Sequence, residues 1–164
     1  METLQADAHA IAESLKARNE TIAVAESSAG GLIAAALLCV PGASKYFLAG
    51  AVVYTQQARA GLLGISDEDM LGMRSSSEPY AVFLAERVRI RHGADWGLAE
   101  TGAAGPSGNR YGDAAGHTCV AVAGPVQSVL TLETGLSERT DNMRRFAACA
   151  LSALNEAISC KIGK

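Results

Sequence analysis

The sequence has few aromatic residues, little excess charge and no patterned cysteines. Aromatic side chains make up 5% of its 164 residues, so the core must be built largely from alanine, valine, leucine and isoleucine. The formal net charge is −3, which is not the basic surface that binds nucleic acids or anionic membranes. We therefore expect neither partner. A phosphate ligand would be held by local backbone amides and a few placed cations.

The cysteines and the apolar segments also exclude several classes of protein. Cys39, Cys119, Cys149 and Cys160 form no C-x-x-C pair and have no histidine at the spacing of zinc ligands. We interpret them as structural thiols and expect no metal. No apolar run reaches the roughly 18 residues of a membrane span, and the N-terminus lacks the apolar segment of a signal peptide. A reducing cytoplasm is the expected location.

Apolar periodicity predicts helices that alternate with strands. We expect helices over residues 3–18, 32–39, 55–63, 75–92 and 138–158, and strands over 21–25, 46–54, 95–101, 117–123 and 127–133. Gly124 and Pro125 join the last two strands into a β-hairpin. The pattern predicts an α/β fold, a three-layer α/β/α sandwich with a mixed sheet, in a single domain over residues 1–164.

Two serines and two glycines follow the first predicted strand, in the turn Ser27-Ser28-Ala29-Gly30-Gly31. Glycines let a ligand approach the backbone closely, and the start of the next helix presents unpaired N–H groups and a positive dipole end. The serines could donate to a phosphate or attack a carbonyl. The alternative is a tight turn with a serine N-cap.

A second glycine-rich loop follows the third predicted strand. It begins at Thr101, Gly102 and Gly105 and continues through Asn109 and Arg110. Because ligands of α/β sheets bind beyond the carboxyl ends of strands, the two loops could line one crevice.

Arg59 and the histidines are weaker candidates. Arg59 lies one helical turn beyond Thr55, where it could meet a phosphate or a carboxylate, although such an arginine more often lies on a solvated helix face. His9 and His92 are expected to be structural. His117 flanks the second glycine-rich loop and stays a candidate for function.

Three segments together resemble a known family. TIAVAESSAGGLIAAAL resembles a strand, an AESCTGG-type loop and a helix; PGASKYFLAGAVVYTQQARAGLLGI is similar to a PGSS…F…G…V.YSN..K..LLG stretch; ETGAAGPSGN resembles an SGIAGP.GG loop. In this order and spacing, residues 5–158 resemble the CinA C-terminal-domain family, the competence/damage-inducible family of bacterial nicotinamide mononucleotide deamidases. Larger family members carry an additional N-terminal domain, and we expect this chain to lack it.

The resemblance implies a serine-based, metal-independent amidohydrolase that needs no cofactor. It would convert nicotinamide mononucleotide to nicotinate mononucleotide and ammonia, with Ser27 as the nucleophile. Together with the two loops, it indicates catalytic positions at Ser27, Arg59 and Thr101, and substrate-binding positions at Ser28, Gly30, Gly31, Ser44, Tyr54, Gly102, Gly105, Asn109 and Arg110. A homo-oligomer is the expected assembly.

Arg59 departs from the family pattern, because it stands where the family has its general-base lysine. An arginine keeps its proton in a protein site, so it can bind anions but cannot readily act as the base toward Ser27. Ser28-Ala29 and Thr55-Gln56 also replace Cys-Thr and Ser-Asn of the family, and residues 113–116 replace K-P-V-G. Several positions that face the ligand therefore differ together.

Three functions are consistent with these residues. The first is an amidohydrolase for nicotinamide mononucleotide or a related pyridine nucleotide, with another base such as His117 or a water held by Glu26 or Glu100. The second is a nucleotide-binding protein without catalysis. The third is an enzyme that uses the same pocket for a different amide or ester.

Overall fold

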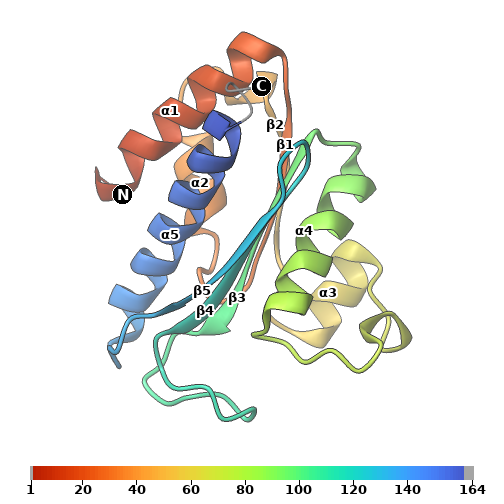
Figure 1. Cartoon of the computed structure of the whole chain (residues 1–164), viewed down its shortest axis with the longest axis vertical. Helices are drawn as coiled ribbons and strands as arrows, with labels where there is room; N and C mark the ends of the chain where they lie inside the picture. Colours follow the sequence, from red (N-terminus) through yellow and green to blue (C-terminus); the bar gives the residue numbers. More distant parts are fainter. Residues whose placement is uncertain (1, 161–164) are drawn as a thin grey trace.

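Five strands of the described residues form one mixed sheet in the order β2-β1-β3-β4-β5 (Figure 1). The structure is a computed structural model that describes residues 2–160. β1 (Ile22–Glu26) pairs in parallel with both β2 (Phe47–Val52) and β3 (Trp96–Ala103). β4 (His117–Ala123) pairs antiparallel with β3 and with β5 (Ser128–Glu133), and the pair of β4 and β5 is the expected hairpin.

Helices cover both faces of this sheet. α1 (Glu2–Arg18), α2 (Leu32–Leu38) and α5 (Arg139–Cys160) lie on one face, and α3 (Gln56–Leu63) and α4 (Glu78–His92) lie on the other (Figure 1). Short 3-10 helices span Ala43–Lys45 and Glu68–Met70. The predicted α/β fold with three layers and a mixed sheet is therefore confirmed.

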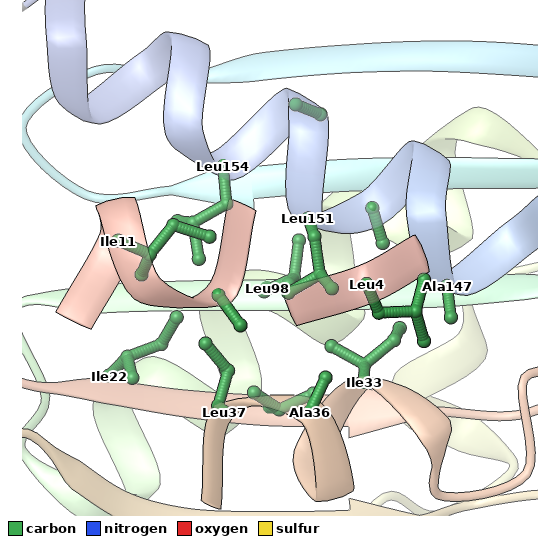
Figure 2. Close-up of a cluster of buried hydrophobic side chains, with 14 of the residues drawn as sticks. Leu4, Ile11, Ile22, Ile33, Ala36, Leu37, Leu98, Ala147, Leu151 and Leu154 are labelled. Atoms are coloured by element: carbon green, nitrogen blue, oxygen red, sulfur yellow. The ribbon is translucent and has the colours of Figure 1, made fainter. Parts of the chain in front are cut away.

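The core under α1, α2 and α5 is mainly aliphatic, with Tyr46, Trp96 and Phe146 as fully buried aromatic side chains. Figure 2 shows Leu4 and Ile11 of α1 packed with Leu37 of α2 and Leu154 of α5, and all four are fully buried. The apolar residues of the first helix thus face the core that α1 shares with α2 and α5. Each such side chain contributes roughly 1.5–3 kcal/mol when it is removed from water.

The opposite core is built largely from alanine, which lets α4 approach the sheet closely. Ala81 and Ala85 of α4 are fully buried against Ala99 of β3. A Cβ on Gly97 would lie only 2.1 Å from the carbonyl oxygen of Ala85, so this position of β3 requires glycine. Small side chains in place of aromatic ones thus allow the backbones of α4 and β3 to lie close together.

The cysteines differ from the expectation of structural thiols. Cys119 is buried in β4 and Cys149 is half-buried, but Cys39 and Cys160 are exposed. Cys39 follows the exposed Leu38 at the C-terminal end of α2, and Cys160 is the last residue of α5. Among residues 2–160, no three His, Cys, Asp or Glu side chains are arranged to hold a metal ion. None of the helices described is long and apolar enough to cross a membrane.

Candidate functional site

A cleft of about 390 Å³ lies beyond the carboxyl ends of the three parallel strands. Its walls are the turn after β1, the segment from the end of β2 into α3, the segment before α4 with its first turn, and the end of β3 with the loop that follows. Parallel strands end at the same edge of a sheet, which is why segments far apart in the sequence meet there. Both glycine-rich loops thus reach one crevice, as the sequence predicted.

Seven of the predicted site residues line this cleft: Ser27, Tyr54, Arg59, Thr101, Gly102, Asn109 and Arg110. Gly102 is required where β3 meets β4, because a Cβ there would lie 2.3 Å from the carbonyl oxygen of His117. The hydroxyl of Thr101 accepts a hydrogen bond from the backbone N–H of Ser76, at 3.1 Å, and so ties β3 to the segment before α4.

The other five predicted positions, Ser28, Gly30, Gly31, Ser44 and Gly105, are not among the residues that line the cleft. Ser44 lies in the 3-10 helix before β2, at the opposite edge of the sheet. Gly30 faces α5, where a Cβ would lie 2.7 Å from the Met143 methyl carbon. Gly105 has a φ of +103°, and its carbonyl accepts a hydrogen bond from Arg139.

The N-terminus of α2 is occupied by a side chain of the protein itself. The carboxylate of Glu26 accepts hydrogen bonds from the backbone N–H groups of Gly31, Ile33 and Ala34, at 2.9, 3.1 and 3.0 Å. The expectation that these amides are unpaired and free for a phosphate is therefore wrong. Burial raises the pKa of Glu26 and the nearby Glu100 adds to this, while the three amides oppose it.

Glu100 anchors the serine turn, residues 27–31, by hydrogen bonds. It accepts hydrogen bonds from the backbone N–H groups of Ser27 and Ala29, at 3.1 and 2.8 Å, and from the hydroxyl of Ser28, at 2.5 Å. Thr118 donates to the same carboxylate at 2.7 Å. Ser28 is 2% exposed and thus serves the turn. Both glutamates are fully buried under the turn, so neither can hold a water in the cleft.

Ser27 differs from its neighbour, because its side chain lines the cleft. Its backbone N–H donates to Glu100, which fixes the residue at the end of β1. Among the contacts of residues 2–160, its hydroxyl makes no hydrogen bond. The hydroxyl is thus placed to bind or attack a ligand.

Arg59 is buried, contrary to the expectation of a solvated helix face. It is 7% exposed, although Thr55 starts α3 as predicted by accepting a hydrogen bond from the Ala58 N–H. Its Nη2 lies 3.2 Å from the Asp67 carboxylate, and its guanidinium lies 6.0 Å from the centre of the Tyr80 ring. Burial raises the pKa of Tyr80, and Arg59 partly opposes that rise.

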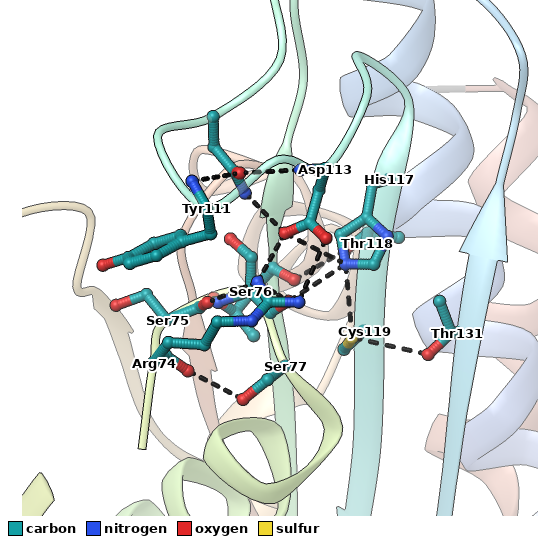
Figure 3. A network of polar contacts seen from close by, with 12 residues as sticks. Arg74, Ser75, Ser76, Ser77, Tyr111, Asp113, His117, Thr118, Cys119 and Thr131 are labelled. Carbon is teal, nitrogen blue, oxygen red and sulfur yellow. Dashed lines mark hydrogen bonds and ion pairs between the residues drawn. The ribbon is translucent and has the colours of Figure 1, made fainter. Parts of the chain in front are cut away.

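The loop after β3 is fastened to the segment before α4 by an ion pair (Figure 3). Arg74 donates to both oxygens of Asp113, at 2.5 and 3.0 Å, and lies 5.5 Å from the centre of the Tyr111 ring. The guanidinium of Arg74 holds the pKa of the Asp113 carboxyl below its ordinary value. Asn109 donates to Asp113 and accepts from the Tyr111 N–H, so its amide also shapes the loop.

His117 belongs to this network rather than to the cleft wall (Figure 3). It is buried, with Nδ1 bonded to Glu133 and Nε2 at 3.0 Å from the carbonyl oxygen of Ser76. Burial alone would lower the pKa of His117, but Glu133, the Ser76 carbonyl and Asp113 together raise it. Both ring nitrogens are engaged, so His117 is not placed to act as a base for Ser27.

Sequence reasoning missed three kinds of residue around the site. Tyr111 lines the cleft directly after Arg110, and that proximity in the loop was a usable signal. Tyr80 lines it from the first turn of α4, on the face that also contacts the core. Arg139, at the start of α5, donates to Tyr54 at 3.3 Å and to Gly105 at 2.6 Å. No local pattern predicts that contact, because more than thirty residues separate the partners.

The charges that line the cleft all have one sign. Arg59 and Arg110 line it, and no Asp, Glu, His or Lys of the described chain does. The hydrogen bond from Arg110 lowers the pKa of Tyr111, and its guanidinium lies 5.1 Å from the centre of that ring. The cleft therefore suits an anionic ligand with a flat ring that can lie against tyrosine.

Comparisons with known proteins agree with the fold. A sequence model described as the CinA C-terminal domain matches residues 4–158. CinA-like proteins from Gloeobacter violaceus and Desulfosudis oleivorans are 39% and 42% identical over 140 residues, which cover 84% of this chain and 33% and 34% of those proteins. The chain thus spans about a third of the length of these curated relatives.

A crystal structure shows the same architecture. A competence-damaged protein (CinA) superfamily protein from Klebsiella pneumoniae aligns with a TM-score of 0.87 at 24% identity, covering 95% of this chain and 98% of that one. The likeness shows that the five-stranded sheet and its flanking helices are shared.

Proposed function

The chain belongs to the CinA C-terminal domain family, and from this membership together with the charges of the cleft we propose that it binds a phosphorylated pyridine nucleotide such as nicotinamide mononucleotide. The observation that carries the proposal is the pair Arg59 and Arg110 in a cleft that no carboxylate of residues 2–160 lines. Guanidinium groups form paired, charge-assisted hydrogen bonds with phosphates. A cleft of about 390 Å³ falls within the range of small-molecule sites.

The tyrosines support a ligand that carries an aromatic ring. Tyr54, Tyr80 and Tyr111 all line the cleft. A pyridinium ring can lie against the face of a tyrosine, and its positive charge strengthens that contact. A nucleotide of this class thus matches both the charges and the rings of the site.

Hydrolysis of the ligand's carboxamide is the second candidate function, and the position of Ser27 favours it. In that reaction the Ser27 oxygen would attack the carboxamide carbon, the C–N bond would break, and the serine proton would pass to the leaving NH₂ group to give ammonia. Water would then release the acid from the serine. The step needs a base for the serine proton. Because no Lys, His, Asp or Glu of the described chain lines the cleft, binding is the function that the geometry supports best.

Calorimetric titration of the purified protein with nicotinamide mononucleotide tests the proposal, with ammonia release followed in parallel. We expect saturable binding that Arg110→Gln weakens, and ammonia release no greater than that of Ser27→Ala. Absence of binding would contradict the proposal. Ammonia release that Ser27→Ala abolishes would establish the second candidate function instead.

A further inference from the structure

The two arginines of the cleft stand in different surroundings. Arg59 is 7% exposed and lies on α3, whereas Arg110 is exposed and lies on the loop after β3. An exposed cation can bind an anion that keeps part of its hydration. A buried cation requires an anion that gives up its water, which small planar groups do at less cost than a phosphate dianion.

The buried guanidinium has capacity for a ligand. The ion pair with Asp67, 3.2 Å from Nη2, and the contact with the Tyr80 side chain use only part of a fork that carries five N–H donors. The Asp67 side chain is 85% exposed, so water screens this ion pair. A carboxylate matches the fork with two parallel hydrogen bonds. A carboxamide offers one acceptor oxygen, and its NH₂ group faces the N–H donors of the arginine unfavourably.

The exposed guanidinium suits the phosphate. Arg110 donates to the Tyr111 hydroxyl at 3.0 Å and otherwise faces solvent at the rim of the cleft. A phosphate bound there remains partly hydrated, while the ring of the ligand extends inward toward Ser27 and Arg59. This orientation places the group attached to the ring beside the buried arginine.

We propose that the cleft selects a ligand with two anionic groups, a carboxylate at Arg59 and a phosphate at Arg110. The inference rests on the proposed function and sharpens it: the preferred ligand is the acid, nicotinate mononucleotide, rather than the amide. Arg59, which cannot readily act as a base, is thus the group that recognises the carboxylate of the acid.

Parallel calorimetric titrations with nicotinate mononucleotide and nicotinamide mononucleotide test this selection. The acid is expected to bind about ten- to hundredfold more tightly, the range for hydrogen bonds to a charged group. Equal affinities, or tighter binding of the amide, would overturn this inference and leave the proposed function standing. Failure of both nucleotides to bind would overturn both.

Variants of the two arginines test the orientation. Arg59→Gln is expected to weaken the acid far more than the amide, so that the ratio of the two affinities approaches one. Arg110→Gln is expected to weaken both ligands alike and to preserve the ratio. Loss of the ratio in Arg110→Gln instead would show that the carboxylate lies at the rim, which would overturn the assignment.

Asp67→Asn gives an independent test if Arg59→Gln fails to fold. Asp67 is exposed, makes no side-chain cap hydrogen bond at its 3-10 helix, and competes for Arg59. Removing its charge should raise the preference for the acid about two- to threefold, within the range of an exposed ion pair. An unchanged or lower preference would contradict a carboxylate at Arg59.

Discussion

Arg74 and Asp113 form a bidentate ion pair with N···O distances of 2.5 and 3.0 Å. This ion pair joins the segment before α4 to the loop after β3. The loop carries Arg110 and Tyr111 into the cleft, and the ring of Tyr111 lies against Arg74. The ion pair therefore positions Arg110 and Tyr111 in the wall of the cleft.

Asp113→Asn should loosen this loop. The amide keeps one acceptor but loses the charge, so we expect ligand affinity to fall several-fold and trypsin to cleave faster after Arg110. The free energy of unfolding should fall by only about 1 kcal/mol, because Arg74 is partly exposed and water screens the pair. Titration, timed proteolysis and urea unfolding measure these effects.

Glu86→Gln is the matched control for that variant. Glu86 pairs with Arg89 at 2.7 Å on the surface of α4, away from the cleft. Its loss should leave both affinity and cleavage unchanged. Equal effects of the two variants would show that the Arg74–Asp113 pair does not position the loop.

Glu26→Ala should be strongly destabilising. It removes a buried acceptor from three backbone N–H groups of α2, so the free energy of unfolding should fall by about 2–4 kcal/mol. Glu26→Gln keeps an acceptor oxygen and should cost less. Urea unfolding measures both, and equal losses would contradict the role of the acceptor oxygens.

Because Glu26 can ionise, the difference in the free energy of unfolding between Glu26→Gln and the unchanged protein should depend on pH. Burial raises its pKa in the folded state, so the folded protein binds the proton more tightly than the unfolded chain does. Stability is thus lost as the pH rises from the ordinary carboxyl pKa through the raised one. The stability of Glu26→Gln relative to the unchanged protein should therefore improve over that interval.

His117 should make stability depend on pH with a recognisable sign. Its pKa is raised in the folded state, as Glu133, the Ser76 carbonyl and Asp113 outweigh the effect of burial. Its contribution is present in full below the ordinary histidine pKa and is lost as the pH rises through the raised value. His117→Gln should cost about 1–2 kcal/mol near pH 6 and less near pH 9. A constant cost in urea unfolding would argue against a charged His117.

Arg59→Lys tests the argument about the missing base. A desolvated lysine can take the proton of a serine, which an arginine cannot. We expect Ser27-dependent ammonia release from nicotinamide mononucleotide to appear or to rise about a hundredfold, the scale of general-base catalysis. Arg110→Lys, which leaves position 59 unchanged, should show no such gain. An inactive Arg59→Lys protein that still binds the nucleotide would refute the base argument.

Periodicity alone predicts most of the secondary structure. The stripe of Leu4, Ile11 and Leu15 indicates α1, and short apolar runs between turn residues indicate the five strands, all of which are present. These signals are local: a helix repeats its buried face every three to four residues, and a buried strand is apolar throughout. The boundaries of the elements differ by only a few residues.

Part of the candidate site is predictable from residues near the end of a strand or the start of a helix. Turns and helix starts indicate Ser27, Thr101 and Arg59, and these residues line one cleft because the parallel strands end together. Ser28, Gly30 and Gly31 lie in the same turn and yet serve the fold. The side on which each of these residues packs depends on its hydrogen-bond or packing partner, and those partners come from other elements of the fold.

Glu26 and Glu100 show this division most clearly. They are register partners on β1 and β3, 74 positions apart, and no local pattern relates them. Side by side in the sheet, one carboxylate holds the amides of α2 and the other holds the serine turn. The chain's local chemistry specifies where strands, helices and turns form. Strand pairing and burial determine which polar groups form hydrogen bonds within the fold and which, like those of Ser27 and Arg59, line the cleft where a ligand can bind.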